Sequence, residues 1–270
     1  CNRDIKFRAF LDYALDRGAD FIATGHYARV RQSDGICHLL RAHDQDKDQT
    51  YFLYLLDQGQ LGRSLFPLGG LTKERVRELA RGAGLPNYRK KDSTGICFIG
   101  ERRFSDFLRR YLPARPGPMV SEDGEILGEH QGLMYYTLGQ RKGLGLGGRA
   151  GAGEAPWFVV AKDLEANRLV VAQGGTHPLL MSAALTAAQL HWIAEPPMPD
   201  GETLHCAARI RHRQPLQACR ARLSGPAQLR VEFNRPQRAV TPGQSVVLYQ
   251  GDECLGGGII EQAGRPGAHP

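Results

Sequence analysis

Two cysteines are the residues of this sequence that are best placed to do chemistry. Cys97 follows a Thr-Gly pair in the stretch DSTGICFIG, and the three cations of RKKD lie within the eight residues before it. Nearby positive charge lowers the pKa of a thiol and favours the thiolate, which attacks electrophiles or carries sulfur. The chain also begins with a cysteine, Cys1 of CNRDIKF. Because a lone cysteine is more often a small buried hydrophobe, the pattern around Cys97 leaves both roles open.

Gly25 and His26 follow a short apolar stretch, FIA at 21–23, which predicts a buried strand after an opening helix. A helix that leads into an apolar strand is half of an α/β unit. Ligands of such sheets bind beyond the carboxyl ends of the strands, where these two residues would lie. A histidine at such a position can equally have no functional task.

Three stretches predict helices. LTKERVRELARGAGL at 71–85 is the strongest, with Thr72 as its cap. DKDQT at 46–50 predicts a helix N-terminus capped by Asp46 or Asp48. The opening residues predict an amphipathic helix whose apolar face holds Ile5, Phe10, Leu11, Ala14 and Leu15.

Two further patterns invite a ligand but allow a plain structural explanation. The glycines of GLGLGG at 143–148 lack the preceding strand and the following acid of a dinucleotide fingerprint, so they predict a loop. If ARIRHRQ at 208–214 is a strand, its period of two places Arg209, Arg211 and Arg213 on one face. That face is either solvated or in contact with an RNA backbone.

The composition is that of an ordinary folded protein with a basic balance. Of 270 residues, 41% are hydrophobic and 23% are charged, which argues against disorder. The net charge of +7 suggests a polyanionic partner without requiring one. No apolar run reaches the ~20 residues of a membrane span, and no signal-peptide pattern opens the chain. We therefore expect a cytoplasmic protein without a membrane partner and with reduced thiols. Because the first methionine is Met119, we also expect a piece of a longer protein.

The order of patterns predicts an α/β plus β fold in three parts. Residues 1–95 have the pattern of the C-terminal part of an α/β domain. Residues 96–156, which are rich in Gly and Pro, predict a small central domain, and the short β-rich runs of 157–270 predict an antiparallel β-barrel. None of the six cysteines lies in a C-x-x-C pair and the histidines lack zinc spacing, so we expect no metal site.

Ten stretches, in order along essentially the whole chain, resemble the tRNA-specific 2-thiouridylase family. They are CNRDIKF, GADFIATGHYAR, KDQTYFLYLL, FPLGGLTKERVRELA, DSTGICFIGERRF, YTLGQRKGLGLGG, PWFVVAKD, QGGTHPLL, IRHRQP and VTPGQSVVLYQGDECLGGGII. The resemblance implies a nucleotide-binding PP-loop (adenine nucleotide α-hydrolase-like) domain, a central tRNA-contacting domain and a C-terminal β-barrel. It implies a sulfurtransferase that replaces oxygen by sulfur at C2 of the wobble uridine of tRNA. The enzyme would use ATP with Mg²⁺ and a persulfide from an upstream donor protein.

The resemblance also implies roles for individual residues. Cys97 would carry the persulfide, and Cys1 would be the nucleophile that attacks it. Gly25 would lie against ATP, since the lack of a side chain permits close approach. The implied tRNA contacts are His26, Lys47, Asp48, Gln49, Arg211, His212 and Gln244. His212 stands where the family usually has tyrosine, although imidazole can also stack on a base.

One motif of the family is missing from these 270 residues, the phosphate loop Ser-Gly-Gly-x-Asp-Ser. We therefore expect the chain alone to bind ATP poorly and to be inactive. Three alternatives stay open: a PP-loop enzyme that adenylates a carbonyl and uses an amine nucleophile, a non-catalytic tRNA-binding fragment, and a thiol oxidoreductase that uses Cys1 and Cys97. The lack of a C-x-x-C motif counts against the last of them.

Overall fold

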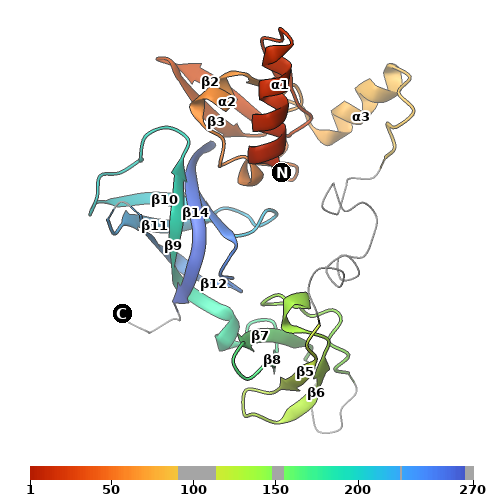
Figure 1. Cartoon of the computed structure of the whole chain (residues 1–270), viewed down its shortest axis with the longest axis vertical. Coiled ribbons are helices and arrows are strands. Elements are labelled where there is room, and N and C mark those ends of the chain that lie inside the picture. The colour runs from red at the N-terminus through yellow and green to blue at the C-terminus, as the bar shows by residue number, and fades with distance from the viewer. Residues whose placement is uncertain (91–113, 148–154, 226, 265–270) are drawn as a thin grey trace. The chain divides into compact units, whose positions relative to one another are not determined.

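The computed structural model describes residues 1–90, 114–147, 155–225 and 227–264, and these divide into two compact units (Figure 1). The first unit combines residues 1–90 with 183–235 and 242–264. The second contains the described residues up to Ser182 that follow Lys90, together with 236–241. No helix within these described ranges is long and apolar enough to span a membrane.

The N-terminal part of the first unit alternates short helices and strands. Its elements are η1 (Asn2–Ala9), α1 (Phe10–Asp16), β1 (Ile22–Ala23), β2 (Ala28–Ser33), β3 (Ile36–Arg41), η2 (Thr50–Phe52), α2 (Gln58–Gly62), β4 (Ser64–Leu65) and α3 (Lys73–Gly82). Strands β1 and β4 pair in parallel, with Ile22 opposite Ser64. This parallel pair follows an opening helix, as the sequence predicts, and is the α/β part of the fold.

The opening helix is confirmed, but its predicted apolar face is partly wrong. Ile5 and Phe10 are 59% and 53% exposed, whereas Phe7 is fully buried. The reason is that η1 is a π-helix: the Lys6 N–H donates to the Cys1 carbonyl five residues earlier, at 3.1 Å. A wider turn changes which residues share a face, so a pattern counted at 3.6 residues per turn selects the wrong side chains.

The two other helix predictions have opposite outcomes. Helix α3 begins after Thr72, whose side chain accepts a hydrogen bond from the Arg75 N–H at 3.2 Å, as predicted. The predicted helix start at Asp46 to Asp48 is wrong. The helical turn there is η2, which starts only at Thr50, and neither Asp46 nor Asp48 caps it.

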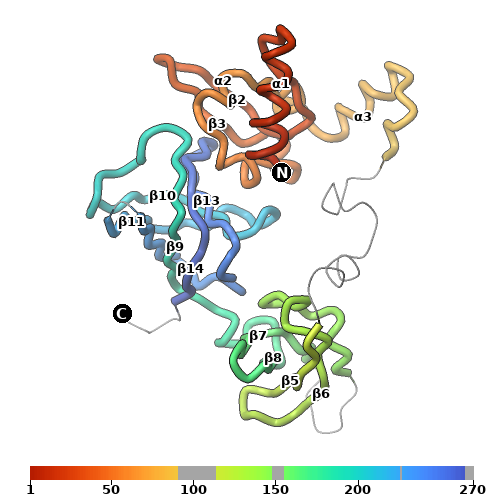
Figure 2. The backbone as a smooth tube through the Cα atoms, viewed as in Figure 1, coloured from red at the N-terminus to blue at the C-terminus, as the bar shows by residue number. Residues whose placement is uncertain are grey.

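The rest of the first unit is a closed antiparallel barrel of six strands, as the sequence predicts. The ring runs β13-β10-β11-β12-β9-β14 and closes through the pairing of β14 with β13, which Figure 2 traces side by side. The sheet then continues from β14 to β3 and β2. The strands are β9 (Met181–Trp192), β10 (Thr203–Arg209), β11 (Gln217–Leu223), β12 (Leu229–Arg238), β13 (Ser245–Gln250) and β14 (Glu253–Gly264).

Glycines allow β14 to lie between two neighbours. A Cβ added at Gly257 would lie 2.0 Å from the Val246 carbonyl oxygen of β13. At Gly256, where φ is +132°, it would lie 2.2 Å from the His191 carbonyl oxygen of β9. A side chain at either position would separate the strands that close the barrel.

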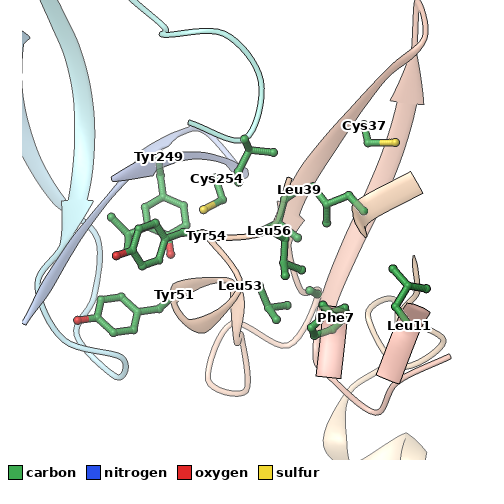
Figure 3. Packing of buried hydrophobic residues seen from close by; sticks show 14 of the residues in the cluster. Phe7, Leu11, Cys37, Leu39, Tyr51, Leu53, Tyr54, Leu56, Tyr249 and Cys254 are labelled. Carbon is green, nitrogen blue, oxygen red and sulfur yellow. The ribbon is translucent and has the colours of Figure 1, made fainter. Parts of the chain in front are cut away.

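One apolar core joins the N-terminal part to the barrel (Figure 3). Phe7 and Leu11 lie at one end of this core, and Tyr249 and Cys254 of the barrel lie at the other. Leu53 lies between them and is fully buried. These parts therefore cannot move independently without exposing apolar surface to water.

The second unit is built on a four-stranded sheet of order β6-β5-β8-β7. Its elements are β5 (Gly117–Val120), β6 (Ile126–His130), η3 (Leu133–Tyr135), β7 (Trp157–Asp163), β8 (Arg168–Gln173) and η4 (Pro178–Leu180). Strands β7 and β8 thus pair with this sheet and not with the barrel ring, while the predicted boundaries near 95 and 156 stay predictions. The glycine-rich stretch is a loop over its described residues, 143–147, as predicted.

Candidate functional site

Gly25 and His26 follow β1 at its carboxyl end, where the sequence analysis expects a ligand. The Thr24 N–H donates to the Leu65 carbonyl at 3.0 Å and extends the parallel pair to this point. The His26 side chain is 9% exposed, and its ring centroid lies 5.6 Å from that of Phe7. Burial, with a smaller contribution from the positive charge of Lys6, lowers the pKa of His26 to about 4. His26 is therefore neutral at neutral pH.

Gly25 is not required by the packing of the chain itself. A Cβ added there would meet Leu68 Cδ1 at 3.8 Å, which is an ordinary van der Waals contact. Its backbone is also outside the left-handed region that favours glycine. A glycine that neither sterics nor dihedral angle demands leaves free space beside the strand end, which suits the close approach of a ligand.

Gln49 fixes the loop of residues 46–49 against the segment that follows His26. The Gln49 N–H donates to the Tyr27 carbonyl at 2.9 Å, and the Tyr27 N–H donates to Gln49 Oε1 at 2.9 Å. Two hydrogen bonds between the same pair of residues define one relative position. Lys47 and His26 are thereby held in neighbouring segments of the same unit.

Asp48 is buried, and both of its carboxylate oxygens have partners inside the protein. Oδ1 accepts from the Ala42 N–H at 3.0 Å. Oδ2 accepts from Thr50 Oγ1 at 2.8 Å and from Arg209 Nη1 at 2.6 Å. The side chains of Asp48 and Arg209 are 0% and 4% exposed, so this ion pair connects the loop to β10 in the interior. The tRNA contact of Asp48 stays a prediction; its observed contacts are internal.

The predicted face of three arginines on one strand is wrong. Strand β10 ends at Arg209, and the chain then turns, with the Gln214 N–H donating to the Arg211 carbonyl at 3.1 Å. Arg209 therefore lies inside the protein while Arg213 is exposed. The turn breaks the period of two on which the prediction depends.

His212 lies in this turn and packs against an aromatic side chain of the N-terminal part. Its ring centroid is 4.3 Å from that of Phe52, with an angle of 36° between the planes. Burial lowers the pKa of His212, and the charges of Arg213 and Arg209 lower it further. Its Nδ1 atom is buried without a hydrogen-bond partner among the described residues. A neutral imidazole with one unused nitrogen can accept or donate a hydrogen bond to a ligand.

Phe52 also connects this turn to the start of the chain. Asn2 Nδ2 donates to the Phe52 carbonyl at 3.3 Å, so the residue that follows Cys1 is held beside Phe52, whose ring contacts His212. Cys1 is exposed. The structure thus links Asn2, next to Cys1, to His212 through Phe52, although the two ends of this link are 210 positions apart in the sequence. The spacing in the sequence gives no signal for this proximity.

Gln244 is exposed beside Ser245, which two buried tyrosines contact. Tyr51 Oη donates to the Ser245 carbonyl at 2.9 Å, and Tyr54 Oη lies 3.0 Å from Ser245 Oγ. Burial raises the pKa of Tyr51 to about 12, so its hydroxyl stays protonated. Because Tyr51 precedes Phe52, these bonds place Gln244 and His212 around η2.

A basic groove of about 780 Å³ lies along α3 and includes Lys47. Lys73, Arg77 and Arg81 recur every four residues, so they lie on one side of the helix. The groove is lined by Lys47, Lys73, Glu74, Arg77, Glu78, Arg81, Tyr88 and Arg89. The sequence analysis missed this surface, although the pattern K-x-x-x-R-x-x-x-R at 73–81 is its signal.

Cys97 lies outside the described residues, so its distance from Cys1 stays a prediction. Among the residues that the structure does describe, no group of three or more His, Cys, Asp or Glu side chains could hold a metal ion.

Three family models match consecutive parts of the chain. One described as the tRNA methyl transferase HUP domain matches residues 1–101, and one described as the tRNA methyl transferase PRC-barrel domain matches residues 105–173. The third, described as the aminomethyltransferase beta-barrel domain, matches residues 182–260. The fold is therefore that of a HUP-domain protein with a PRC-barrel-like domain and a C-terminal β-barrel.

Relatives that match nearly the whole chain share one name. The tRNA-specific 2-thiouridylase MnmA of Methylococcus capsulatus is 62% identical over 261 residues, which cover 97% of this chain and 70% of the relative. That of Streptococcus mutans is 57% identical over 264 residues, with 97% and 70% covered. That of Burkholderia pseudomallei is 57% identical over 276 residues, with 100% and 71% covered. The chain belongs to the tRNA-specific 2-thiouridylase family.

Proposed function

We propose that this chain is a tRNA-uridine 2-sulfurtransferase, which replaces oxygen by sulfur at C2 of the wobble uridine and acts in the cytoplasm. The observation that carries the proposal is the match to thiouridylases along 97% of the chain at 62% identity. The arrangement of the first unit supports it, because Asn2, the neighbour of Cys1, bonds to Phe52, which forms with His212 an aromatic pair on which a base could stack.

ATP would supply the leaving group, since adenylation of the C2 oxygen lets it depart as AMP. Gly25 fits the approach of a nucleotide, because the protein leaves space where its side chain would be. Mg²⁺ would accompany the phosphates of ATP and not occupy a protein cage, as is usual for this ion. His26, neutral beside Gly25, can donate or accept a hydrogen bond without repelling a cation at that place.

The sulfur step needs two thiols with different tasks. Cys97 would hold the persulfide, received from a donor protein. Attack of the Cys1 thiolate on the inner sulfur of this persulfide forms a Cys1–Cys97 disulfide and releases hydrosulfide, which displaces AMP from C2. An external thiol reductant then returns both cysteines to the reduced state. The exposure of Cys1 supports its part in this step.

Two surfaces would bind the tRNA. Lys47 and the cations of α3 offer a groove for backbone phosphates, which carry affinity but no sequence information. Gln49, Arg211, His212 and Gln244 would contact nucleotides near the wobble base. Asp48, whose partners are internal, would act as a positioning residue that holds Lys47 and the 210–214 turn in place through Arg209.

The test is to analyse the wobble uridine of tRNA from cells that carry the whole gene encoding this chain, with and without the substitution Cys97→Ser. Mass spectrometry of the nucleoside distinguishes an added sulfur from an added methyl group. We expect 2-thiouridine with the unchanged gene and none with Cys97→Ser, whereas Cys206→Ser, a partly exposed cysteine outside the proposed site, keeps the modification. Persistence of 2-thiouridine in Cys97→Ser, as expected of an enzyme with an amine nucleophile, would overturn the proposal.

A tRNA-binding protein without catalysis is the remaining alternative. It would retain tRNA on a filter with salt-dependent affinity, yet the unchanged gene would restore no 2-thiouridine to cells that lack the modification. The two measurements together therefore separate binding from sulfur transfer.

A further inference from the structure

Two cysteines outside the proposed sulfur site lie opposite each other on neighbouring strands of the barrel. Cys206 of β10 is the direct cross-strand partner of Cys219 of β11. Their Sγ atoms are 3.7 Å apart. Along β11 buried residues alternate with exposed ones, and Cys219 shares the buried side with Ala221 and Leu223. Both thiols are free.

We propose that Cys206 and Cys219 are an oxidation site that forms an intramolecular disulfide across β10 and β11. Directly opposed residues of antiparallel strands have Cα atoms ~4.5–5.5 Å apart. A disulfide accommodates Cα separations of ~4.4–6.8 Å, so the backbone already meets the requirement. Closing the gap between the sulfurs to the ~2.05 Å of the bond needs side-chain rotation and no shift of strand register.

The surroundings of the pair decide which thiol reacts first. A cavity of about 350 Å³ is lined by both cysteines, and Cys206 is partly exposed while Cys219 is 3% exposed. The hydrogen bond with Cys206, together with burial, raises the pKa of the Cys219 thiol. Cys219 therefore stays protonated and out of reach of a solute, and Cys206 is the thiol that meets an oxidant.

With hydrogen peroxide as oxidant, the Cys206 thiolate attacks one oxygen, becomes a sulfenic acid and releases hydroxide. The Cys219 sulfur then attacks the Cys206 sulfur and expels water, for which the Cys219 thiol supplies the proton. In sum, two thiols lose two electrons, and one peroxide becomes two waters. A dithiol reductant reverses the change by exchange.

The bond would close the loop that carries the proposed tRNA contacts Arg211 and His212. Residues 206 and 219 are the two sides of the hairpin base, and the turn lies between them. A crosslink here constrains the unfolded chain more than the folded one, so the oxidised protein unfolds at a temperature higher by roughly 5 °C or more. The inference is independent of the proposed function, because neither thiol takes part in the sulfur step.

Peptide mapping tests the bond directly. The full chain is treated with hydrogen peroxide under native conditions, then acidified, denatured with an alkylating reagent and digested with trypsin. Trypsin places Cys206 in the peptide 169–209 and Cys219 in the peptide 214–220, so their linkage gives one ion that is two hydrogens lighter than the sum. We expect this ion, its loss on reduction and its absence in Cys206→Ser.

Two controls isolate the pair. Cys37 and Cys254 are buried in the core of the same unit and should remain alkylated as single thiols. The linked ion should persist in Cys1→Ser, because it does not depend on the proposed sulfur site. Sulfenic or sulfinic acid at Cys206 without the linked ion, no reaction at Cys206 at all, or linkage that requires denaturant during oxidation would each overturn the inference.

Discussion

Arg209 and Arg77 show how the same side chain has different tasks in two regions of the first unit. The side chain of Arg209 is 4% exposed, and its Nη1 atom lies 2.6 Å from Asp48 Oδ2. Arg77 lies in a groove on α3, a helix with no buried residue, among four other cations and two glutamates. Burial removes a charge from water and makes its partner obligatory, whereas an exposed charge remains available to a ligand.

This difference separates charged residues that are held by internal partners from charged residues that stay open to solvent. The net charge of +7 counts both arginines equally. Arg209 could not bind phosphate without giving up Asp48, whereas Arg77 is exposed and could bind phosphate without breaking a buried ion pair. Replacing charged residues in each region, and measuring stability and tRNA affinity, tests this comparison.

Removing the charge of Asp48 should have the largest effect. Asp48→Asn keeps an oxygen for the Ala42 N–H but leaves Arg209 as an unpaired buried cation, so we expect a loss of about 3–5 kcal/mol in the free energy of unfolding. Denaturant titration measures it. The matched control is Glu78→Gln, which removes the partner of Arg75 on exposed α3, at 3.0 Å, and should cost at most ~1 kcal/mol. Equal losses in both variants would contradict the distinction between the regions.

Acid should destabilise the first unit through His26. Its pKa in the folded state is about 4, below its ordinary value of 6.5, because burial disfavours the charged form. The contribution of neutral His26 to stability is thus fully present above pH 6.5 and is lost as the pH falls towards 4. Over this range the unfolded chain binds a proton at His26 more tightly than the folded chain does. The loss is on the order of 3 kcal/mol at pH 4.

Denaturant titrations between pH 7 and pH 4 check this prediction. His26→Phe keeps a ring beside Phe7 and should flatten the pH profile by the amount that His26 contributes. His205→Asn, at an exposed histidine, should leave the profile unchanged. An identical profile in His26→Phe and the unchanged chain would show that other groups cause the acid sensitivity.

Neutralising α3 should weaken tRNA binding, with a loss of only about 1 kcal/mol in stability from the contact of Lys73 with the Tyr27 ring. For Lys73→Gln/Arg77→Gln/Arg81→Gln we expect a roughly tenfold weaker affinity at low salt and a smaller dependence of affinity on salt, by up to about one unit of slope per lost phosphate contact. Filter binding over a salt series measures both. The control with the same charge change replaces exposed Arg17, Arg31 and Arg222 by Gln. An equal loss of affinity in this control would mean that net charge, and not the groove, determines tRNA binding.

The ring contact between Phe52 and His212 should show the smallest effect. A double-mutant cycle of Phe52→Leu and His212→Ala should give a coupling of about 0.5–1.5 kcal/mol in the free energy of unfolding, because ring contact adds to simple burial. His212→Tyr keeps an aromatic ring at this position and should retain most of this coupling. Additive single variants would mean that the contact places no constraint on the turn.

Local patterns were sufficient where a local interaction decides the structure. The Thr72 side chain caps α3 through a bond that spans three residues, and the alternation of β-rich runs predicted the barrel. The same reasoning failed at 46–50. The Asp48 carboxylate binds Arg209, 161 residues away, and therefore does not cap a helix at its own position. The reasoning also failed at Arg209, where a turn ends the strand, and at Ile5, where a π-helix changes the period.

The sequence by itself determined the family, the order of the parts and the residues whose chemistry matters, because motifs and periodicities are written along the chain. Tertiary structure decided which of those residues are available. It placed Asp48 and Arg209 in the interior, His212 against Phe52, and Cys206 opposite Cys219. The physical reason is that burial and pairing join segments far apart along the chain. Spacing between neighbouring residues in the sequence carries no information about such contacts.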